Sequence, residues 1–128
     1  MIRVLIIAPQ KHTAESIAGA LDGQRMVSTT VSEGTQALEQ LDRNPPDAVV
    51  LAMGAQTEPG EELCRAVCER TLAPVLVVGR REQDLDVERV LAAGADAHVL
   101  EPFAKEVLVA QLWALLRRVG LVAQARSA

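Results

Sequence analysis

The residues that could do chemistry in this chain are few, and they stand at the ends of four apolar runs. These runs end in Ala8-Pro9, Ala52, Gly79 and Glu101. In an open parallel sheet, ligands and catalytic groups gather just beyond the carboxyl ends of the strands. One carboxylate among small residues and a proline offers neither an activated nucleophile nor a set of hard metal ligands. The pattern predicts a scaffold without catalytic chemistry, and we expect no enzyme activity.

The cysteines and histidines are the other candidate ligands. Cys64 and Cys68 stand four residues apart, on one face of a predicted helix, whereas His12 and His98 belong to distant segments. Zinc in a structural site takes four ligands, and a reactive thiol needs an electropositive setting. Two cysteines are also too few for a secreted disulfide framework. We expect Cys64 in the core, Cys68 partly covered, and no metal ion or other cofactor.

The composition limits the partners of this segment. Its 128 residues fit one domain, and 49% hydrophobic residues with only 2% aromatics predict an aliphatic core. The net charge of -4 and the lack of aromatic stacking platforms argue that this segment binds no nucleic acid. The apolar runs are far shorter than the roughly 20 residues of a membrane span, and no signal-peptide pattern opens the chain. We expect a cytoplasmic protein that binds no membrane.

Strand-like and helical patterns alternate five times along the chain. The strand-like runs cover residues 2–7, 26–30, 48–51, 75–78 and 97–100. Residues 48–51 are apolar on both faces, as a central parallel strand requires, whereas residues 26–30 are more polar and suit a sheet edge. Five strand–helix units in one domain predict a doubly wound α/β sheet.

The predicted helices carry signals at their ends and on their buried faces. Gly23 and Gly94 are the predicted left-handed caps of the first and fourth helices, and Ser32 is the predicted N-cap of the second. The predicted apolar positions of the fourth helix are Leu85, Val90 and Leu91, and those of the last helix, from about residue 104 to 119, are Leu108, Leu112, Leu115 and Leu116.

Four short motifs punctuate the chain: Asn44-Pro45-Pro46-Asp47, Gly94-Ala95-Asp96, Pro102-Phe103 and Ala114-Leu115-Leu116-Arg117-Arg118. With them, the chain resembles the receiver domain of two-component response regulators. The resemblance implies a flavodoxin-like fold, with five parallel strands in the order 2-1-3-4-5 and five helices. It also implies a receiver-like domain at residues 1–119, with a linker or C-terminal tail at 120–128. The last motif resembles the winged-helix subclass, whose receivers usually precede a DNA-binding domain.

The positions that carry the family's phosphotransfer chemistry hold other residues in this chain. A typical receiver holds Mg²⁺ with two acidic residues after the first strand and with the aspartate that accepts the phosphoryl group. These positions correspond to Ala8, Pro9 and Ala52. Methyl groups and a proline ring supply no oxygen ligand, and alanine is not a nucleophile, so we expect no Mg²⁺.

The three remaining family positions of the pocket also differ. The hydroxyl residue that senses the phosphoryl group corresponds to Gly79, the lysine before the proline to Glu101, and the switching aromatic to His98. Of the remaining acids, Asp47 is predicted at the amino end of its strand, and Glu58 lacks a second carboxylate beside it. Because positioning and electrostatics dominate phosphoryl transfer, neither is expected to replace the phosphoacceptor.

Two charged residues and a histidine near this pocket leave alternatives open. Arg80 and Glu101 follow neighbouring strands in the family order, so they are a candidate ion pair across the emptied pocket. Alternatively both point into water, where a pair contributes about 0–1 kcal/mol. His98 is a candidate pH-sensitive group, or it fills the space of an aromatic ring at the edge of the fifth strand.

The resemblance also implies a dimer face, because receivers of the winged-helix subclass pair through the fourth helix, fifth strand and fifth helix. Several of the charges that usually line this face are absent. The candidate residues are Val87, Ala92, Ala97, Gln111 and Trp113. Trp113 either anchors an apolar interface or covers the edge of the core.

These observations lead to a pseudo-receiver as the predicted function. It is a phosphorylation-independent signalling and homodimerisation module of an atypical response regulator in transcription regulation, with a DNA-binding domain as a candidate continuation. The alternative is a sensor domain that binds a small molecule in the vacated crevice.

Overall fold

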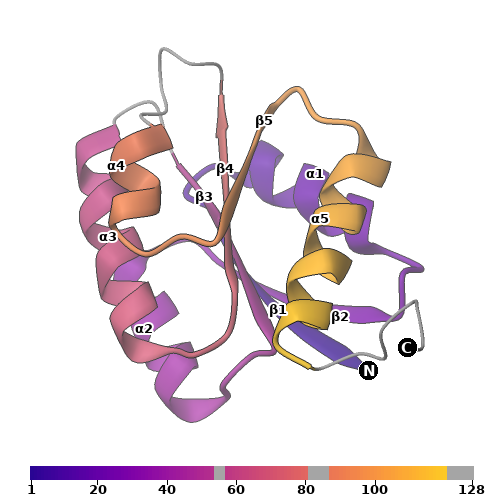
Figure 1. Ribbon diagram of the computed structural model, residues 1–128, viewed down its shortest axis with the longest axis horizontal. Helices are drawn as coiled ribbons and strands as arrows, with labels where there is room; N and C mark the ends of the chain where they lie inside the picture. The colour runs from indigo at the N-terminus through magenta and orange to yellow at the C-terminus, as the bar shows by residue number, and fades with distance from the viewer. Residues whose placement is uncertain (54–56, 81–86, 121–128) are drawn as a thin grey trace.

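The computed structural model describes residues 1–53, 57–80 and 87–120, and Figure 1 shows the elements that they form. The strands are β1 (Ile2–Ile7), β2 (Met26–Val31), β3 (Ala48–Ala52), β4 (Val75–Arg80) and β5 (Ala97–Glu101). The helices are α1 (Lys11–Leu21), α2 (Gly34–Arg43), α3 (Thr57–Arg70), α4 (Val87–Ala92) and α5 (Lys105–Arg118). The alternation predicted from the sequence is confirmed.

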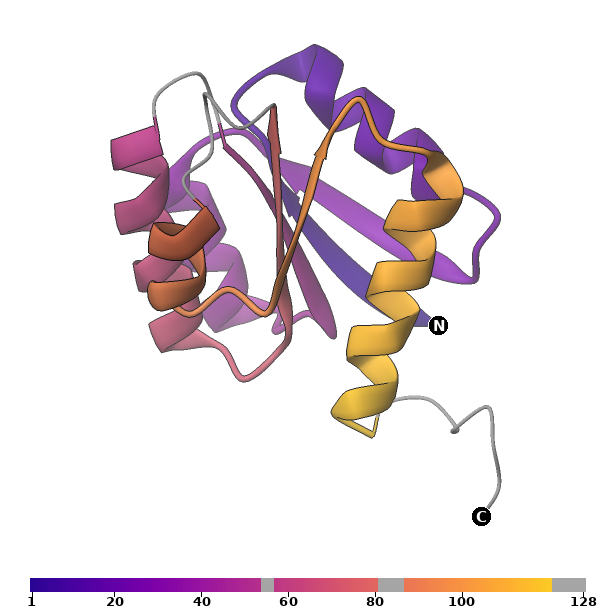
Figure 2. The ribbon, with the colours of Figure 1, turned by 45° about the horizontal axis from the view of Figure 1, so that its top comes forward.

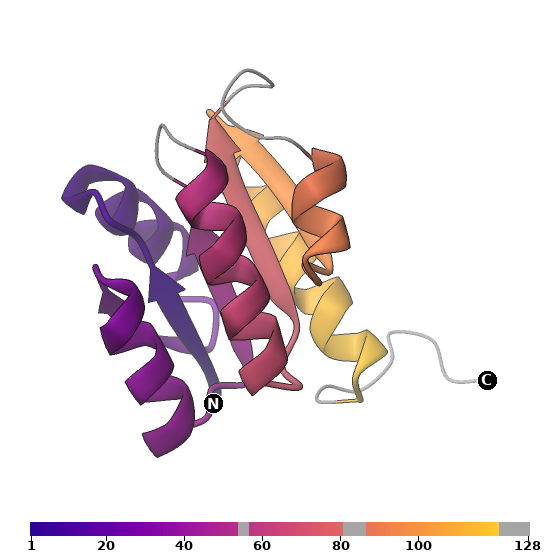
Figure 3. The ribbon, with the colours of Figure 1, turned by 90° about the vertical axis from the view of Figure 1, so that its left-hand side faces the viewer.

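The five strands form one parallel sheet in the order β2-β1-β3-β4-β5, which confirms the predicted topology. Helices α1 and α5 cover one face, and α2, α3 and α4 cover the other (Figures 2 and 3). Every residue of the central strand β3 is buried, as two covered faces require. The carboxyl ends of β1, β3, β4 and β5 therefore meet at one edge of a rigid sheet.

Two aliphatic cores lie on either side of this sheet. Along β1, Val4 and Ile6 point into the core beneath α1 and α5, whereas Leu5 and Ile7 point into the core beneath α2, α3 and α4. The alternation follows from the period of two residues in a strand. In the part of the chain that the structure describes, no helix is long and apolar enough to cross a membrane.

The start of α2 differs from the prediction. Glu33, not Ser32, is the N-cap residue, and no side chain forms a capping hydrogen bond. The reason is that β2 extends to Val31 in order to pair with Ile7, which moves the helix start towards Gly34. The Ser32 N–H donates instead to the Gln36 side-chain Oε1 at 3.4 Å.

The described part of α4 buries one of the apolar residues that the sequence places on this helix. Val90 is fully buried, whereas Leu91 is 42% exposed. Leu85 lies outside the described residues. The left-handed conformations predicted for Gly23 and Gly94 are confirmed, with φ values of 76° and 119°.

Candidate functional site

Small apolar side chains fill the carboxyl edge of the sheet at the ends of β1 and β3. Ala8 is 1% exposed and Ala52 is 4% exposed, and both belong to the core beneath α1 and α5. Their backbones are held in the sheet, because the Ala8 N–H donates to Val31 O at 2.9 Å and the next residue after Ala52, Met53, donates to Val78 O at 2.9 Å. The two methyl groups thus extend the core to the rim.

A long side chain crosses this rim. The Arg80 guanidinium Nη2 donates to the side-chain Oε1 of Gln10 at 3.3 Å, and its Nε lies 3.9 Å from the Glu101 Oε2. Gln10 follows β1, and β3 lies between β1 and β4. Arg80 therefore spans the end of β3, above Ala52, and connects three segments at the carboxyl edge.

The Arg80–Glu101 pair is long and partly hydrated. The side chain of Arg80 is 50% exposed and that of Glu101 is 22% exposed. A pair of this kind contributes at most about 1 kcal/mol. Gln10 was not among the residues singled out from the sequence, because nothing local predicts a contact between side chains 70 positions apart.

The pocket positions do not fit a magnesium ion. Mg²⁺ requires octahedral oxygen coordination, usually from one or two carboxylates and waters. Of the five pocket positions, Glu101 alone carries a carboxylate, and that group lies beside the Arg80 cation. Ala8 and Ala52 are buried methyl groups, and Pro9 has no oxygen in its side chain. Within residues 1–53, 57–80 and 87–120, no cluster of three or more acidic, cysteine or histidine residues could hold a metal ion.

Asp47 lies at the opposite edge of the sheet and has a structural role. Its Oδ2 accepts a hydrogen bond from the Arg3 backbone N–H at 2.8 Å, and its own N–H donates to Arg3 O at 2.8 Å. The Arg3 guanidinium also donates to Pro45 O. Asp47 therefore fixes the entry to β3 beside the entry to β1. The side chain of Glu58 lies outside the described part of the structure.

The candidate dimer face comprises α4, β5 and one side of α5. Of its predicted residues, Ala92 is exposed and the others are partly buried: Val87, Ala97, Gln111 and Trp113. Trp113 packs against the core beneath α1 and α5. Two further apolar residues of α4 and α5 were not among the candidates for this face: Leu91 is 42% exposed and Val107 is 48% exposed. Val107 stands four residues before Gln111, on the same face of α5.

Both cysteines and His98 are placed by packing. Cys64 is fully buried and Cys68 is partly buried, as the sequence predicted. A hydrogen bond between the two thiols lowers the pKa of Cys64, whereas the same bond and burial raise the pKa of Cys68. The more accessible thiol is thus the one that holds its proton, which disfavours reactivity. His98 is partly buried in β5, opposite Val77 of β4.

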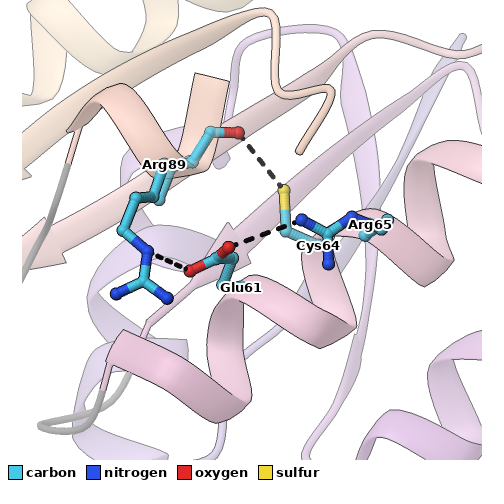
Figure 4. Close-up of polar contacts among 5 residues, drawn as sticks. Glu61, Cys64, Arg65 and Arg89 are labelled. Carbon is cyan, nitrogen blue, oxygen red and sulfur yellow. Dashed lines mark hydrogen bonds and ion pairs between the residues drawn. The ribbon is translucent and has the colours of Figure 1, made fainter. Parts of the chain in front are cut away.

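A cluster of charges joins α3 to α4, and Figure 4 shows its members. Glu61 is 13% exposed, and its Oε2 lies 2.7 Å from the Arg89 Nε of α4, while its Oε1 lies 3.4 Å from the Arg65 guanidinium. The Cys64 thiol lies 4.0 Å from Val90 O. Glu61 therefore ties the short helix α4 to α3. The sequence around Glu61 in α3 carries no local signal for this contact, so only the packing of the two helices reveals the role of Glu61.

Comparison with known proteins places this geometry in a family. Residues 4–113 match the response regulator receiver domain. The sensory transduction protein RegX3 of Mycobacterium tuberculosis is 32% identical over 120 residues, which cover 94% of this chain and 53% of that protein. The transcriptional regulatory protein CseB of Streptomyces avermitilis is 33% identical, over 91% of this chain and 50% of that protein. The DNA-binding response regulator MtrA of Mycobacterium leprae is 29% identical, over 91% of this chain and 52% of that protein.

Solved structures agree on the fold. A two-component response regulator from Clostridium difficile superposes with a TM-score of 0.83 at 22% identity, covering 94% of this chain and 99% of that one. A response regulator from Chloroflexus aurantiacus J-10-fl gives a TM-score of 0.79 at 25% identity, covering 91% and 98% of the two chains. The chain spans about half the length of the curated relatives that it matches.

The α3–α4 cluster predicts unequal effects of two neighbouring substitutions. Glu61→Gln removes the negative charge beside Arg89 and Arg65 and is expected to lower the free energy of unfolding by about 1–2 kcal/mol. Glu62→Gln alters an exposed carboxylate on the same helix and is expected to change it by less than about 0.5 kcal/mol. Urea unfolding of both variants measures the difference, and equal midpoints would contradict the role given to Glu61.

Proposed function

Because the chain belongs to the response regulator receiver domain family, we propose that it is a pseudo-receiver, a signalling module that works without aspartyl phosphorylation. The observation that carries the proposal is the burial of Ala8 and Ala52 at the carboxyl edge. In the family resemblance these are a metal-ligand position and the phosphoacceptor position. Buried methyl groups there leave neither an oxygen ligand nor a nucleophile.

The charge arrangement around these alanines supports the same proposal. Arg80 spans the rim from β4 to Gln10, and Glu101 stands beside it where the resemblance places a lysine. A carboxylate at that position repels a phosphoryl group instead of neutralising it. Arg80 supplies a permanent cation near the place where typical receivers bind Mg²⁺. The carboxyl edge then keeps one arrangement without a chemical trigger.

The relatives support a role in transcription. CseB is named a transcriptional regulatory protein and MtrA a DNA-binding response regulator, and both are about twice as long as this chain. In our proposal the domain at residues 1–119 acts in the cytoplasm within such a regulator. Residues 120–128 link it to a winged-helix DNA-binding domain. The domain itself binds no nucleic acid.

Homodimerisation through α4, β5 and α5 is the proposed means of signalling. Leu91, Ala92 and Val107 expose apolar surface on α4 and α5. Burying apolar side chains in an interface does not carry the desolvation cost of burying charged pairs. The half-buried Trp113 supports α5 from the core side. Expression level and protein contacts, instead of phosphorylation, would then set the fraction of dimer.

Incubation with acetyl phosphate and Mg²⁺ tests the pseudo-receiver directly. The intact mass of the chain is expected to stay unchanged, because no carboxylate stands at the phosphoacceptor position. A receiver domain that carries the acidic residues serves as the positive control under the same conditions. A stable gain of one phosphoryl group on this chain would overturn the proposal.

The proposed dimer face predicts a second outcome. Leu91→Asp places a charge on the exposed apolar surface of α4 and is expected to weaken dimerisation at least tenfold, because the charge must be desolvated. Leu72→Asp is the matched control, since Leu72 is fully exposed in the connection between α3 and β4. Light scattering over a concentration series measures both variants. Equal dimer fractions for the two would exclude this face.

The second candidate function is small-molecule sensing. A hollow of about 590 Å³ is lined in part by Ala8 and Pro9, together with polar side chains of Lys11, Gln36 and Arg43. This volume suits a metabolite, but the lining does not include Ala52, Gly79 or Glu101. A thermal-shift screen of metabolites tests the candidate, because a ligand at 100 times its Kd adds about 2.7 kcal/mol to stability. A screen without any shift would remove this alternative.

A further inference from the structure

The strand β2 ends the sheet with an open backbone edge. Its inner edge pairs with β1: the Ile2 N–H donates to Arg25 O at 3.3 Å and the Ala8 N–H donates to Val31 O at 2.9 Å. The odd-numbered residues therefore direct their backbone groups to β1. Because successive residues of a strand alternate, Met26, Ser28 and Thr30 direct their N–H and C=O groups outwards. Among the described residues, no strand pairs with these groups.

This edge lacks the features that usually prevent edge-to-edge pairing. Exposed edges are commonly protected by lysines, prolines, bulges or short strands. The segment Met26–Val31 contains no charged residue and no proline, and its register with β1 runs through six residues without a bulge. Four of its six residues are valine or threonine, which favour strands. The edge is therefore competent to accept another strand.

We propose that β2 pairs with β2 of a second copy of this chain, antiparallel and centred on Thr29, so that the two sheets become continuous. A two-fold axis perpendicular to the sheet keeps the α2 side of both copies on the same face. Ser28 of one copy then lies opposite Thr30 of the other, and the outward backbone groups of these residues exchange hydrogen bonds. The inference does not depend on the absence of phosphorylation.

The side chains match across this axis. On the α2 face, Val27 lies opposite Val31 of the second copy, and Thr29 lies opposite its own counterpart. These are the closely spaced, non-hydrogen-bonded pairs of an antiparallel ladder, in which β-branched and threonine pairs stabilise by roughly 0.2–1 kcal/mol each. Val27 is 48% exposed and Thr29 is exposed in the single chain. Pairing therefore covers apolar surface that α2 leaves open.

Charge complementarity selects this register. With Thr29 at the centre, Arg25, which directly precedes β2 with a φ of 62°, comes to the level of Glu33 of the second copy, the N-cap residue of α2, and the symmetry repeats the pair at the other end. Centring on Ser28 instead brings Arg25 opposite Val31 and Glu33 opposite Gly23, which leaves both charges without a partner across the interface. The Thr29 register thus aligns apolar, hydroxyl and charged positions together.

The surroundings leave room for the second strand. The hollow of about 590 Å³ is also bordered by Thr30, Val31 and Ser32 at the end of β2, and by the outer side of α2. The end of this edge therefore borders an accessible hollow. Because β2 and β5 are the two opposite edges of the sheet, the contact is also separate from the proposed α4–β5–α5 dimer face.

Site-directed disulfide formation tests the register in the intact chain. Thr29→Cys is expected to form a covalent dimer under mild oxidation, because the two β-carbons would lie about 4.5–5.5 Å apart. Val27→Cys is the matched control on the same strand and face. Its two copies would lie roughly 13 Å apart, so it is expected to cross-link only when mixed with Val31→Cys. The unsubstituted chain is the control for any cross-link that forms through the native Cys64 or Cys68.

A charge exchange provides an independent readout. Arg25→Glu and Glu33→Arg are each expected to weaken the association about tenfold, since two symmetric pairs change from attraction to repulsion. The double variant, which exchanges the charges, is expected to restore it. Sedimentation measures the association, and circular dichroism confirms folding of each variant.

The proposal fails if Thr29→Cys gives no covalent dimer, if Thr29→Cys cross-links to Val27→Cys in preference to itself, or if the double charge variant is weaker than both single ones. None of these results bears on the acetyl phosphate experiment or on the Leu91→Asp comparison. The edge contact and the proposed function can therefore fail separately.

Discussion

The burial of the central strand β3 on both faces is the constraint on which the rest of the structure depends. All five of its residues, Ala48–Ala52, are buried, and helices must cover both sides of the sheet to achieve this. With α1 and α5 on one face and α2, α3 and α4 on the other, each strand is followed along the chain by a helix, and the carboxyl ends of the strands lie at one rim. This packing determines the shape of the carboxyl edge of the sheet, independently of the side chains that stand there.

In this chain the apolar core extends to the carboxyl edge of the sheet. Ala8 and Ala52 lie at the ends of two adjacent strands and are as buried as the residues beneath them. Arg80, the last residue of β4, crosses the end of β3 to reach Gln10. In our proposal, permanent contacts replace those that a metal and a phosphoryl group make transiently in typical receivers. A sheet edge with these fixed contacts favours a domain that acts through contacts of its outer surfaces with other proteins.

Those surfaces lie at the two sides of the sheet. On the β5 side, the short helix α4 is tied to α3 through Glu61 and Arg89 and exposes Leu91 outwards. On the β2 side, an uncharged strand with free backbone groups ends the sheet. Different forces act at the two sides, because α4 offers apolar side chains and β2 offers backbone hydrogen bonds. A protein that uses both would assemble beyond a dimer.

The sequence by itself determined the fold class and which residues end the apolar runs. The two-sided apolar run of β3, the polar edge of β2 and the glycine caps are local signals, so the doubly wound α/β class and most element bounds could be predicted from them, whereas the strand order was predicted from the family resemblance. The residues at Ala8, Pro9, Ala52, Gly79 and Glu101 could also be identified, because each follows an apolar run directly. Local signals failed where two elements compete for the same residues. The pairing of Val31 with Ile7 moved the start of α2 from the position predicted by Ser32.

Only the tertiary structure decided which distant side chains meet. The contact between Arg80 and Gln10 depends on β3 lying between their strands, and the contact between Glu61 and Arg89 depends on how α4 settles against α3. Long charged side chains have many conformers in water, so spacing along the chain does not predict their partners. The direction of the backbone groups at β2 likewise follows from its pairing with β1. Sequence patterns record which face of an element is buried, whereas packing between elements selects the contacts at its ends and edges.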